Sequence, residues 1–344
     1  MKKLLIAVLA LAPMLGLAGY ALAQPRPQVP NKPGVPLARD LQAKMPKPQA
    51  VFDWAYPMVP PNTGPRPDPD ETFTAEGADP SLKFTRRQIS DGFDPPDWFP
   101  KDHAPMPRIV SNGREPHVRA CTLCHLTSGI GHAESAPVSG LPIKYFIRQI
   151  VAFRDGDRVN IRAPNMIELA HDMTDKEMRD AANYYARIPR AQWKSVRVVE
   201  TSRAPANSIF PSGKRMFEKG ANTIPVDPMT IYEVAENYQV ELRNPRVGFA
   251  AYVPSGSLAK GRVVSLGNKG ALRSCASCHG NDLRGREDVP RLAGRSPSYL
   301  VRQLADMKYG HRKGKALGDM KDIAPKLSDA DIVNVAAYLA SRNP

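Results

Sequence analysis

Apolar residues recur at three- and four-residue spacing in several segments of the chain, a pattern that predicts amphipathic helices. Thr174 and Ser328 stand where an N-cap is expected, and each is followed by an aspartate that would lie in the first turn. Another helix is predicted over residues 258–266, with Ser257 as its cap. The clearest helical segments form two pairs, residues 144–153 and 174–188 in the first half and residues 298–307 and 328–341 in the second.

Two other regions lack this helical pattern. Residues 196–199 and 229–241 carry β-branched and aromatic side chains near prolines, which predicts short strands in a small ribbon. Residues 24–106 are rich in proline, which prevents long helices and favours extended segments. Aromatic residues such as Trp54 and Trp98 are spaced among these prolines, so we expect an arm that packs onto a surface. The chain's own surface is favoured over that of a partner.

The chain begins with the features of a secretory signal. Lys2 and Lys3 precede an apolar run over residues 4–22, and small residues lead to an expected cleavage site after Ala23. Pro13 within the run argues against a stable membrane-spanning helix, although an uncleaved signal that anchors the protein is the alternative. We therefore expect export to the periplasm.

A five-residue string with distinctive chemistry occurs twice, as CTLCH at residues 121–125 and CASCH at residues 275–279. Two cysteines separated by two residues can bind both vinyl-derived carbons of one porphyrin, while the adjacent histidine presents a nitrogen to the iron. Two redox disulfides, or one zinc site with four thiolates, would use the same cysteines. Neither alternative explains a histidine directly after both pairs, so we predict two covalently attached haem c groups. The residues expected to hold them are Cys121, Cys124 and His125 in the first copy and Cys275, Cys278 and His279 in the second.

The two halves keep the same register far beyond these strings. An offset of 154 residues separates Cys121 from Cys275, and the same offset matches many further identical residues. The chain therefore contains two copies of one module. The matched pairs include Gly140 and Gly294, Tyr145 and Tyr299, Arg148 and Arg302, Gln149 and Gln303, Arg158 and Arg312, Met166 and Met320, and Tyr184 and Tyr338.

An iron with one histidine ligand keeps an open axial position, which a methionine thioether can fill. Met166 follows His125 by 41 residues, and Met320 follows His279 by the same distance. A lone methionine usually serves in packing, but equal placement in both copies predicts that these two are axial ligands. The competing candidates are Met173, His171 and His132 in the first copy, and Met307 and His311 in the second.

With these motifs, the chain resembles tandem class I c-type cytochromes, in particular the di-haem cytochrome c4 type. The resemblance includes the CxxCH, Tyr-x-x-Arg-Gln, Gly-x-Arg and Met-x-x-x-Ala strings and a closing helix in each copy. It implies a mainly α fold with two small helical haem domains in tandem, histidine and methionine ligation, and electron shuttling in the periplasm. The expected organisation is a signal over residues 1–23, a proline-rich extension over 24–106, a first cytochrome domain over 107–190, a small insert with short strands over 191–254, and a second cytochrome domain over 255–344.

The first copy departs from this family at two places after its motif. Leu126 stands where the family commonly has glycine, as with Gly280 in the second copy. The family commonly has a proline in the loop whose carbonyl accepts the other ring proton of the histidine. Pro290 matches that position, whereas Pro137 is one residue out of register, so the orientation of His125 is open.

Repeat placement also marks polar and aromatic residues that could contact the haem. A guanidinium pairs well with a carboxylate, so arginines present in both copies are candidates for binding haem propionates, with plain solvation at the surface as the alternative. Tyr184 and Tyr338 are instead expected in the core. The haem-contacting candidates are Arg148, Arg302, Arg158 and Arg312, together with Tyr145 and Tyr299.

The chain is basic, with a net charge of +14 that falls to +12 without the signal. Lys308, Arg312, Lys313 and Lys315 form a cluster close to where the second haem edge should emerge. A basic rim there would attract an acidic redox partner, although an ordinary solvated loop is an equal alternative. Nucleic acid is a poor candidate because the chain is expected to be exported and carries no binding motif.

These features predict an exported di-haem electron carrier rather than an enzyme. It would pass single electrons from a donor to an acceptor such as a terminal oxidase, and the iron would do the chemistry without a substrate pocket. A catalytic di-haem enzyme of the peroxidase or thiosulfate dehydrogenase type is one alternative, and it requires an iron with an open or unusual ligand. A cytochrome subunit held to a periplasmic dehydrogenase is the other.

Overall fold

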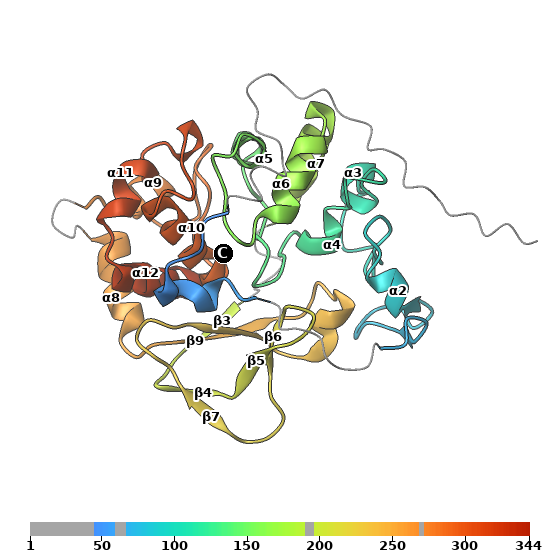
Figure 1. Ribbon diagram of the computed structural model, residues 1–344, viewed down its shortest axis with the longest axis horizontal. Helices are drawn as coiled ribbons and strands as arrows, with labels where there is room; N and C mark the ends of the chain where they lie inside the picture. The colour runs from blue at the N-terminus through green and yellow to red at the C-terminus, as the bar shows by residue number, and fades with distance from the viewer. Residues whose placement is uncertain (1–44, 59–66, 190–195, 268–271) are drawn as a thin grey trace, which may run out of the picture. The chain divides into compact units, whose positions relative to one another are not determined.

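The structure is a computed structural model that describes residues 45–58, 67–189, 196–267 and 272–344 (Figure 1). The predicted signal over residues 1–23 and the first part of the predicted extension lie outside the described residues. No helix within the described residues is long and apolar enough to cross a bilayer.

Two sets of helices follow one another along the chain, drawn in green and in orange to red in Figure 1. Thr174 and Ser328 each cap the last helix of their set through a capping box, which fixes where that helix begins. Gly256, rather than the predicted Ser257, is the N-cap of the helix before the second motif. The first set is α3 (Arg108–Ser111), α4 (Thr122–His125), α5 (Ile143–Arg154), α6 (Pro164–Asp172) and α7 (Asp175–Arg187). The second is α8 (Ser257–Leu266), α9 (Ala276–His279), α10 (Pro297–Lys308), η3 (Lys315–Leu317), α11 (Met320–Ile323), η4 (Ala324–Lys326) and α12 (Asp329–Ser341).

The segment between the two helical sets forms a five-stranded sheet with the strand order β3-β9-β8-β6-β5. Its strand β9 is buried throughout, because alternate residues face two different clusters. Phe249 and Val253 pack with the helices of the second set, whereas Ala250 and Tyr252 pack on the other side of the sheet. The strands are β3 (Val196–Glu200), β5 (Asn207–Ile209), β6 (Arg215–Phe217), β8 (Tyr232–Ala235) and β9 (Phe249–Val253), with β4 (Arg203–Pro205) and β7 (Thr223–Pro225) in a separate pair.

The strand expected over residues 229–241 is shorter than predicted. Only β8 forms there, and the chain then turns into the 3-10 helix η2 (Tyr238–Leu242). The cause is local, because the Asn237 side chain accepts a hydrogen bond from the Gln239 backbone N–H and starts the helical turn.

The described part of the proline-rich extension packs onto the chain's own surface. Its elements are short: η1 (Ala50–Ala55), β1 (Thr72–Phe73), β2 (Phe84–Thr85) and α2 (Arg86–Ile89). Phe52 is fully buried, and the indole N–H groups of Trp54 and Trp98 donate to the carbonyl oxygens of Met229 and Leu242 at 2.8 and 2.6 Å. The aromatic side chains therefore anchor the extension to the insert and to the second helical set.

Helix α8 packs closely along α12 at Gly261. The absence of a side chain there lets the α8 backbone approach the carbonyl oxygen of Asn334 and Cβ of Tyr338. Replacing Gly261 with alanine would therefore push the two helices apart.

We expect Gly261→Ala to lower the free energy of unfolding by about 1–3 kcal/mol, the usual cost of overpacking, despite the better helix propensity of alanine. Urea denaturation followed by circular dichroism measures this. Gly92→Ala is the matched control, because its new methyl group meets only the Arg119 side chain, 3.5 Å away. Equal stability of the two variants would contradict the packing argument.

Candidate haem-binding sites

Each CxxCH string forms one turn of helix, and this turn brings its three functional side chains together. Cys121 precedes the turn in a helical conformation, so that Cys124 and His125 lie three and four residues further on, on the same face. Cys275 holds the equivalent place before α9. All four cysteines are free, and burial raises the pKa of the Cys121 thiol to about 12.

Neither alternative use of the cysteines is seen among the described residues. The sulfurs make no disulfide, and the described residues contain no cluster of three or more histidine, cysteine, aspartate or glutamate side chains that could hold a metal ion. Free thiols beside a histidine suit thioether attachment instead.

Both motif histidines are oriented by a backbone carbonyl. Nδ1 of His125 lies 2.8 Å from the Ala136 oxygen, and Nδ1 of His279 lies 2.7 Å from the Pro290 oxygen. Because a carbonyl oxygen can only accept, Nδ1 carries the proton and Nε2 keeps its lone pair for a metal. Burial lowers the pKa of both imidazoles and favours this neutral form.

The carbonyl group that orients His125 therefore belongs to Ala136, the residue that corresponds to Pro290 at the repeat offset. A main-chain oxygen accepts the proton, so proline is not required there, and the displaced Pro137 has no consequence for this bond. Leu126 adopts a φ of 63°, while Gly280 in the second copy has a φ of 87°. The first copy therefore keeps the same backbone turn with a less suitable residue.

Two cavities collect the predicted ligands from distant parts of the chain. The first, of about 350 Å³, is lined by Cys121, Cys124, His125 and Met166. The second, of about 440 Å³, is lined by Cys275, Cys278, His279 and Met320. Among the competing ligand candidates, Met173 and His132 also line the first cavity and Met307 lines the second, whereas His171 and His311 line neither.

The walls of both cavities suit a flat apolar ring. Phe146, Ile150 and Phe153 line the first, and Leu300 and Leu339 are among the aliphatic residues that line the second. Each cavity thus combines two thiols, one imidazole with a free Nε2 and a thioether within an apolar wall. This set of groups fits covalently attached haem c.

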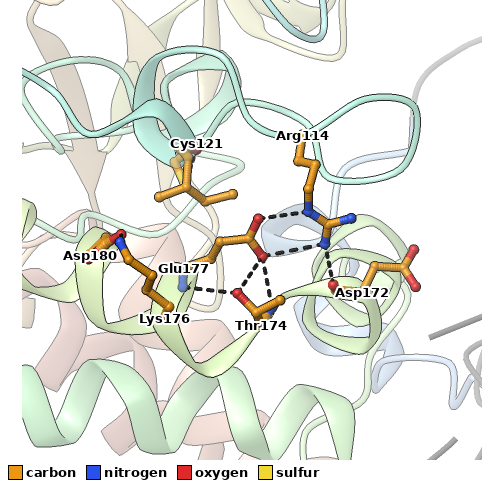
Figure 2. Close-up of polar contacts among 8 residues, drawn as sticks. Arg114, Cys121, Asp172, Thr174, Lys176, Glu177 and Asp180 are labelled. Carbon is orange, nitrogen blue, oxygen red and sulfur yellow. Dashed lines mark hydrogen bonds and ion pairs between the residues drawn. The ribbon is translucent and has the colours of Figure 1, made fainter. Parts of the chain in front are cut away.

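The first site is tied to its closing helix by Arg114 (Figure 2). The Arg114 guanidinium bonds Glu177 at 2.8 Å and the Asp172 carbonyl oxygen at 2.6 Å. Glu177 also completes the capping box with Thr174 at the start of α7. Arg114 therefore fixes the segment before Cys121 against the end of α6, the helix that carries Met166.

Four polar side chains join the two modules between the cavities, and we call Gln149, Gln303, Arg158 and Arg312 the inter-module seam. Arg158 donates to the Gln303 side-chain oxygen at 2.7 Å, and Arg312 donates to that of Gln149 at 2.7 Å. Both arginines are buried, with exposed fractions of 6% and 4%. The backbone shares this symmetry, since Val159 N–H donates to the His311 oxygen and Lys313 N–H donates to the Asp157 oxygen.

The expected basic rim is therefore wrong for two of its four members. Arg312 lies in the buried seam because its side chain reaches Gln149 and Gln303, not solvent. Lys308 is held by Asp329 at 2.6 Å, and only Lys313 and Lys315 are exposed. Lys315 lines the second cavity.

Two of the other candidate residues, Arg148 and Arg302, each line the cavity of the opposite module. Arg302 belongs to the second module but lines the first cavity, and Arg148 belongs to the first module but lines the second. Arg302 is buried and donates to the oxygens of Ala55 and Ala133, whereas Arg148 is half-exposed and lies near Asp288. Tyr145 and Tyr299 line both cavities.

Several residues at this junction carry little or no functional signal in the sequence. Gln149 and Gln303 were visible as a matched pair in the Tyr-x-x-Arg-Gln string, and that placement could have identified them. Asn160 and Asp306, which bond each other at 2.6 Å across the modules, have no such signal because neither is repeated.

Comparisons with known proteins find relatives among the c-type cytochromes. The cytochrome c family model matches residues 264–343. Cytochrome c-554(548) of Halomonas halodenitrificans is 39% identical over 72 residues, which are 21% of this chain and 87% of that protein. The thiosulfate dehydrogenase electron acceptor of Thiomonas intermedia is 27% identical over 230 residues, 66% of this chain and 80% of that protein. Cytochrome c4 of Azotobacter vinelandii is 32% identical over 94 residues, 25% of this chain and 45% of that protein.

These relatives and the two equivalent sites confirm the predicted tandem arrangement, two haem c groups and a role in electron transfer. The chain belongs to the cytochrome c family, as a tandem di-haem class I cytochrome similar to cytochrome c4.

Proposed function

We propose that His125 and Met166 ligate one haem iron and that His279 and Met320 ligate the other. Each haem, when bound, supplies an iron that accepts and releases one electron. The protein holds each histidine by a carbonyl bond, and each methionine lines the same cavity as its histidine. The equal spacing of both methionines from their histidines favours them over Met173 and Met307, which have no counterparts of the same type at the repeat offset.

We propose further that Arg158 and Arg312 bind haem propionates between the cavities. Among the described residues, neither arginine forms an ion pair, and their side-chain bonds go to neutral groups. Burial, followed by the nearby Arg312 charge, lowers the pKa of Arg158. Two buried cations in contact with the same amides need anions, and the carboxylates of the two haems would add to the charge of the nearby Asp306. Arg302, Arg148, Tyr145 and Tyr299 are the further candidates for haem contact, because each lines at least one of the cavities.

The function that the geometry supports best is the transfer of single electrons between protein partners in the periplasm, without a catalytic step on a small substrate. The observation that carries this proposal is the pair of equivalent cavities, each with a histidine and a methionine available as ligands. A diffusing carrier would deliver electrons to an acceptor such as a terminal oxidase.

A second candidate is an electron-accepting subunit of a dehydrogenase. The Thiomonas relative is a thiosulfate dehydrogenase electron acceptor, and a relative from Chlorobaculum tepidum is the cytochrome subunit of a sulfide dehydrogenase. This candidate predicts a lasting complex, whereas a carrier forms only brief encounters.

Replacing either ligand methionine should remove one iron–thioether bond. We expect Met166→Leu and Met320→Leu each to remove about half of the thioether-to-iron charge-transfer absorption of the oxidised protein and to lower one midpoint potential, because thioether ligation raises the potential. Met173→Leu and Met307→Leu are matched controls from the same cavities. Loss of the absorption in a control, or its persistence in Met166→Leu, would reassign the ligand.

Removing a buried cation from the seam should also change the potentials. We expect Arg158→Gln to lower at least one midpoint potential in a redox titration, because a nearby positive charge stabilises the reduced state. Arg179→Gln, an exposed change in the same module, should leave both potentials unchanged. Equal potentials in all three proteins would show that Arg158 does not contact a haem.

Size-exclusion chromatography of the protein extracted from its own cells separates the two functional candidates. At low ionic strength, a diffusing carrier is expected to elute alone, and any association should weaken as salt is added. Elution with a dehydrogenase polypeptide that persists at high salt would favour the subunit role.

A further inference from the structure

The extension reaches the place where both haem modules and the insert meet. Residues 54–57 exchange hydrogen bonds with all three, each through a different group. Arg162 of the first module donates to the Pro57 oxygen at 3.0 Å, and Arg302 of the second donates to the Ala55 oxygen at 2.8 Å. Trp54 donates to the Met229 oxygen of the insert at 2.8 Å.

Tyr56 continues this contact into the buried space between the modules. Its exposed fraction is 3%, and its hydroxyl donates to Oδ1 of Asp306 at 2.6 Å. Asp306 is fully buried, and its Oδ2 accepts from the Asn160 amide of the first module at 2.6 Å. One carboxylate thus connects the extension, the second module and the first module.

Asp306 is also adjacent to the elements that line the haem cavities. It lies on α10, which carries Tyr299, Arg302 and Gln303 into the first cavity, while Asn160 lines that cavity directly. The repeat offset places Ala152 where the second module has Asp306. The contact is therefore an addition of this chain to the duplicated frame.

We propose that Tyr56 and Asp306 are positioning residues that hold the two haem modules at a fixed separation and thereby set the rate of electron exchange between them. The inference rests on the proposed two-haem electron transfer and assigns to the extension a part in it. Transfer of one electron between the modules oxidises one as it reduces the other, so no external reductant is consumed.

The physical reason is that the two arginines of the seam carry like charges. Arg158 and Arg312 reach across the junction only to neutral side-chain acceptors, and the repulsion between the two guanidinium groups opposes the contact. Asp306 brings a negative charge that accepts from both sides, and such charge-assisted bonds are stronger than neutral ones. Burial raises the pKa of the Tyr56 hydroxyl, which keeps its proton available for donation.

The test uses the full holoprotein with Tyr56→Phe and Asp306→Asn. The matched control is Tyr309→Phe, which removes a tyrosine–aspartate bond of similar length, to Asp329 at 2.7 Å, outside the module junction. Haem content and urea midpoint are measured first, so that only folded and fully loaded variants are compared.

Amide hydrogen exchange then measures how often the contact between the two modules opens. In Tyr56→Phe, the Val159 amide, which crosses to the second module, should exchange about tenfold to a hundredfold faster, the factor expected for losing one buried hydrogen bond to a charged group. The Val333 amide in the core of α12 should be unchanged. Tyr309→Phe should leave the Val159 amide unchanged.

Pulse reduction measures the electron exchange itself. Electron equilibration between the haems should slow in Tyr56→Phe and not in Tyr309→Phe. In Asp306→Asn, both midpoint potentials should rise by different amounts, because a buried negative charge is lost.

Unchanged Val159 exchange together with an unchanged equilibration rate in Tyr56→Phe would overturn the proposal while leaving the two-haem function intact. Wild-type protein with fewer than two haems, or without electron equilibration between them, would instead refute the proposed function.

Discussion

Two arginines buried next to each other are the constraint around which the two modules are arranged. Arg158 and Arg312 share Gln149 and Gln303 as acceptors, and burial deprives both charges of water. Such a pair is unfavourable unless anions are close by, and the two cavities open on either side of it. If the proposed propionate contacts form, the cofactors would help to stabilise the junction and would couple haem attachment to the assembly of the modules.

A symmetric pair of modules is placed in asymmetric surroundings. The loop after the first motif, residues 126–133, is buried throughout, whereas most of its counterpart, residues 280–287, is partly or fully exposed. Arg243 of the insert lies against the motif that precedes this loop, since it donates to the carbonyl oxygens of Leu123 and Ile89. The two copies of the haem-binding module therefore differ in solvent exposure and in nearby charge. Such differences are the means by which a protein gives two haems different reduction potentials.

The sequence predicted the parts of this molecule that repeat. CTLCH and CASCH, with the register maintained at an offset of 154 residues, were sufficient to predict two haem c groups and tandem helical domains. Repeat placement also drew attention to Arg158 and Arg312, but it could not distinguish a buried junction from a basic surface. Arg312 stands in a cluster of basic residues, which suggests a solvent-facing rim, while the partner that buries it, Gln149, is 163 residues away.

The unrepeated regions depend on contacts that no local pattern contains. Strand β3 pairs in parallel with β9, whose first residue follows Val196 by 53 positions, and Tyr56 reaches Asp306 across 250 positions. The sequence of residues 196–199 indicates a strand, but burial against the second module determines which strand it pairs with.

The proposed electron transfer depends on both cavities being filled covalently. Intact mass spectrometry of the protein isolated from its own cells is the most direct measurement. Two thioether-linked haems per polypeptide are predicted, and one haem or none would contradict the account.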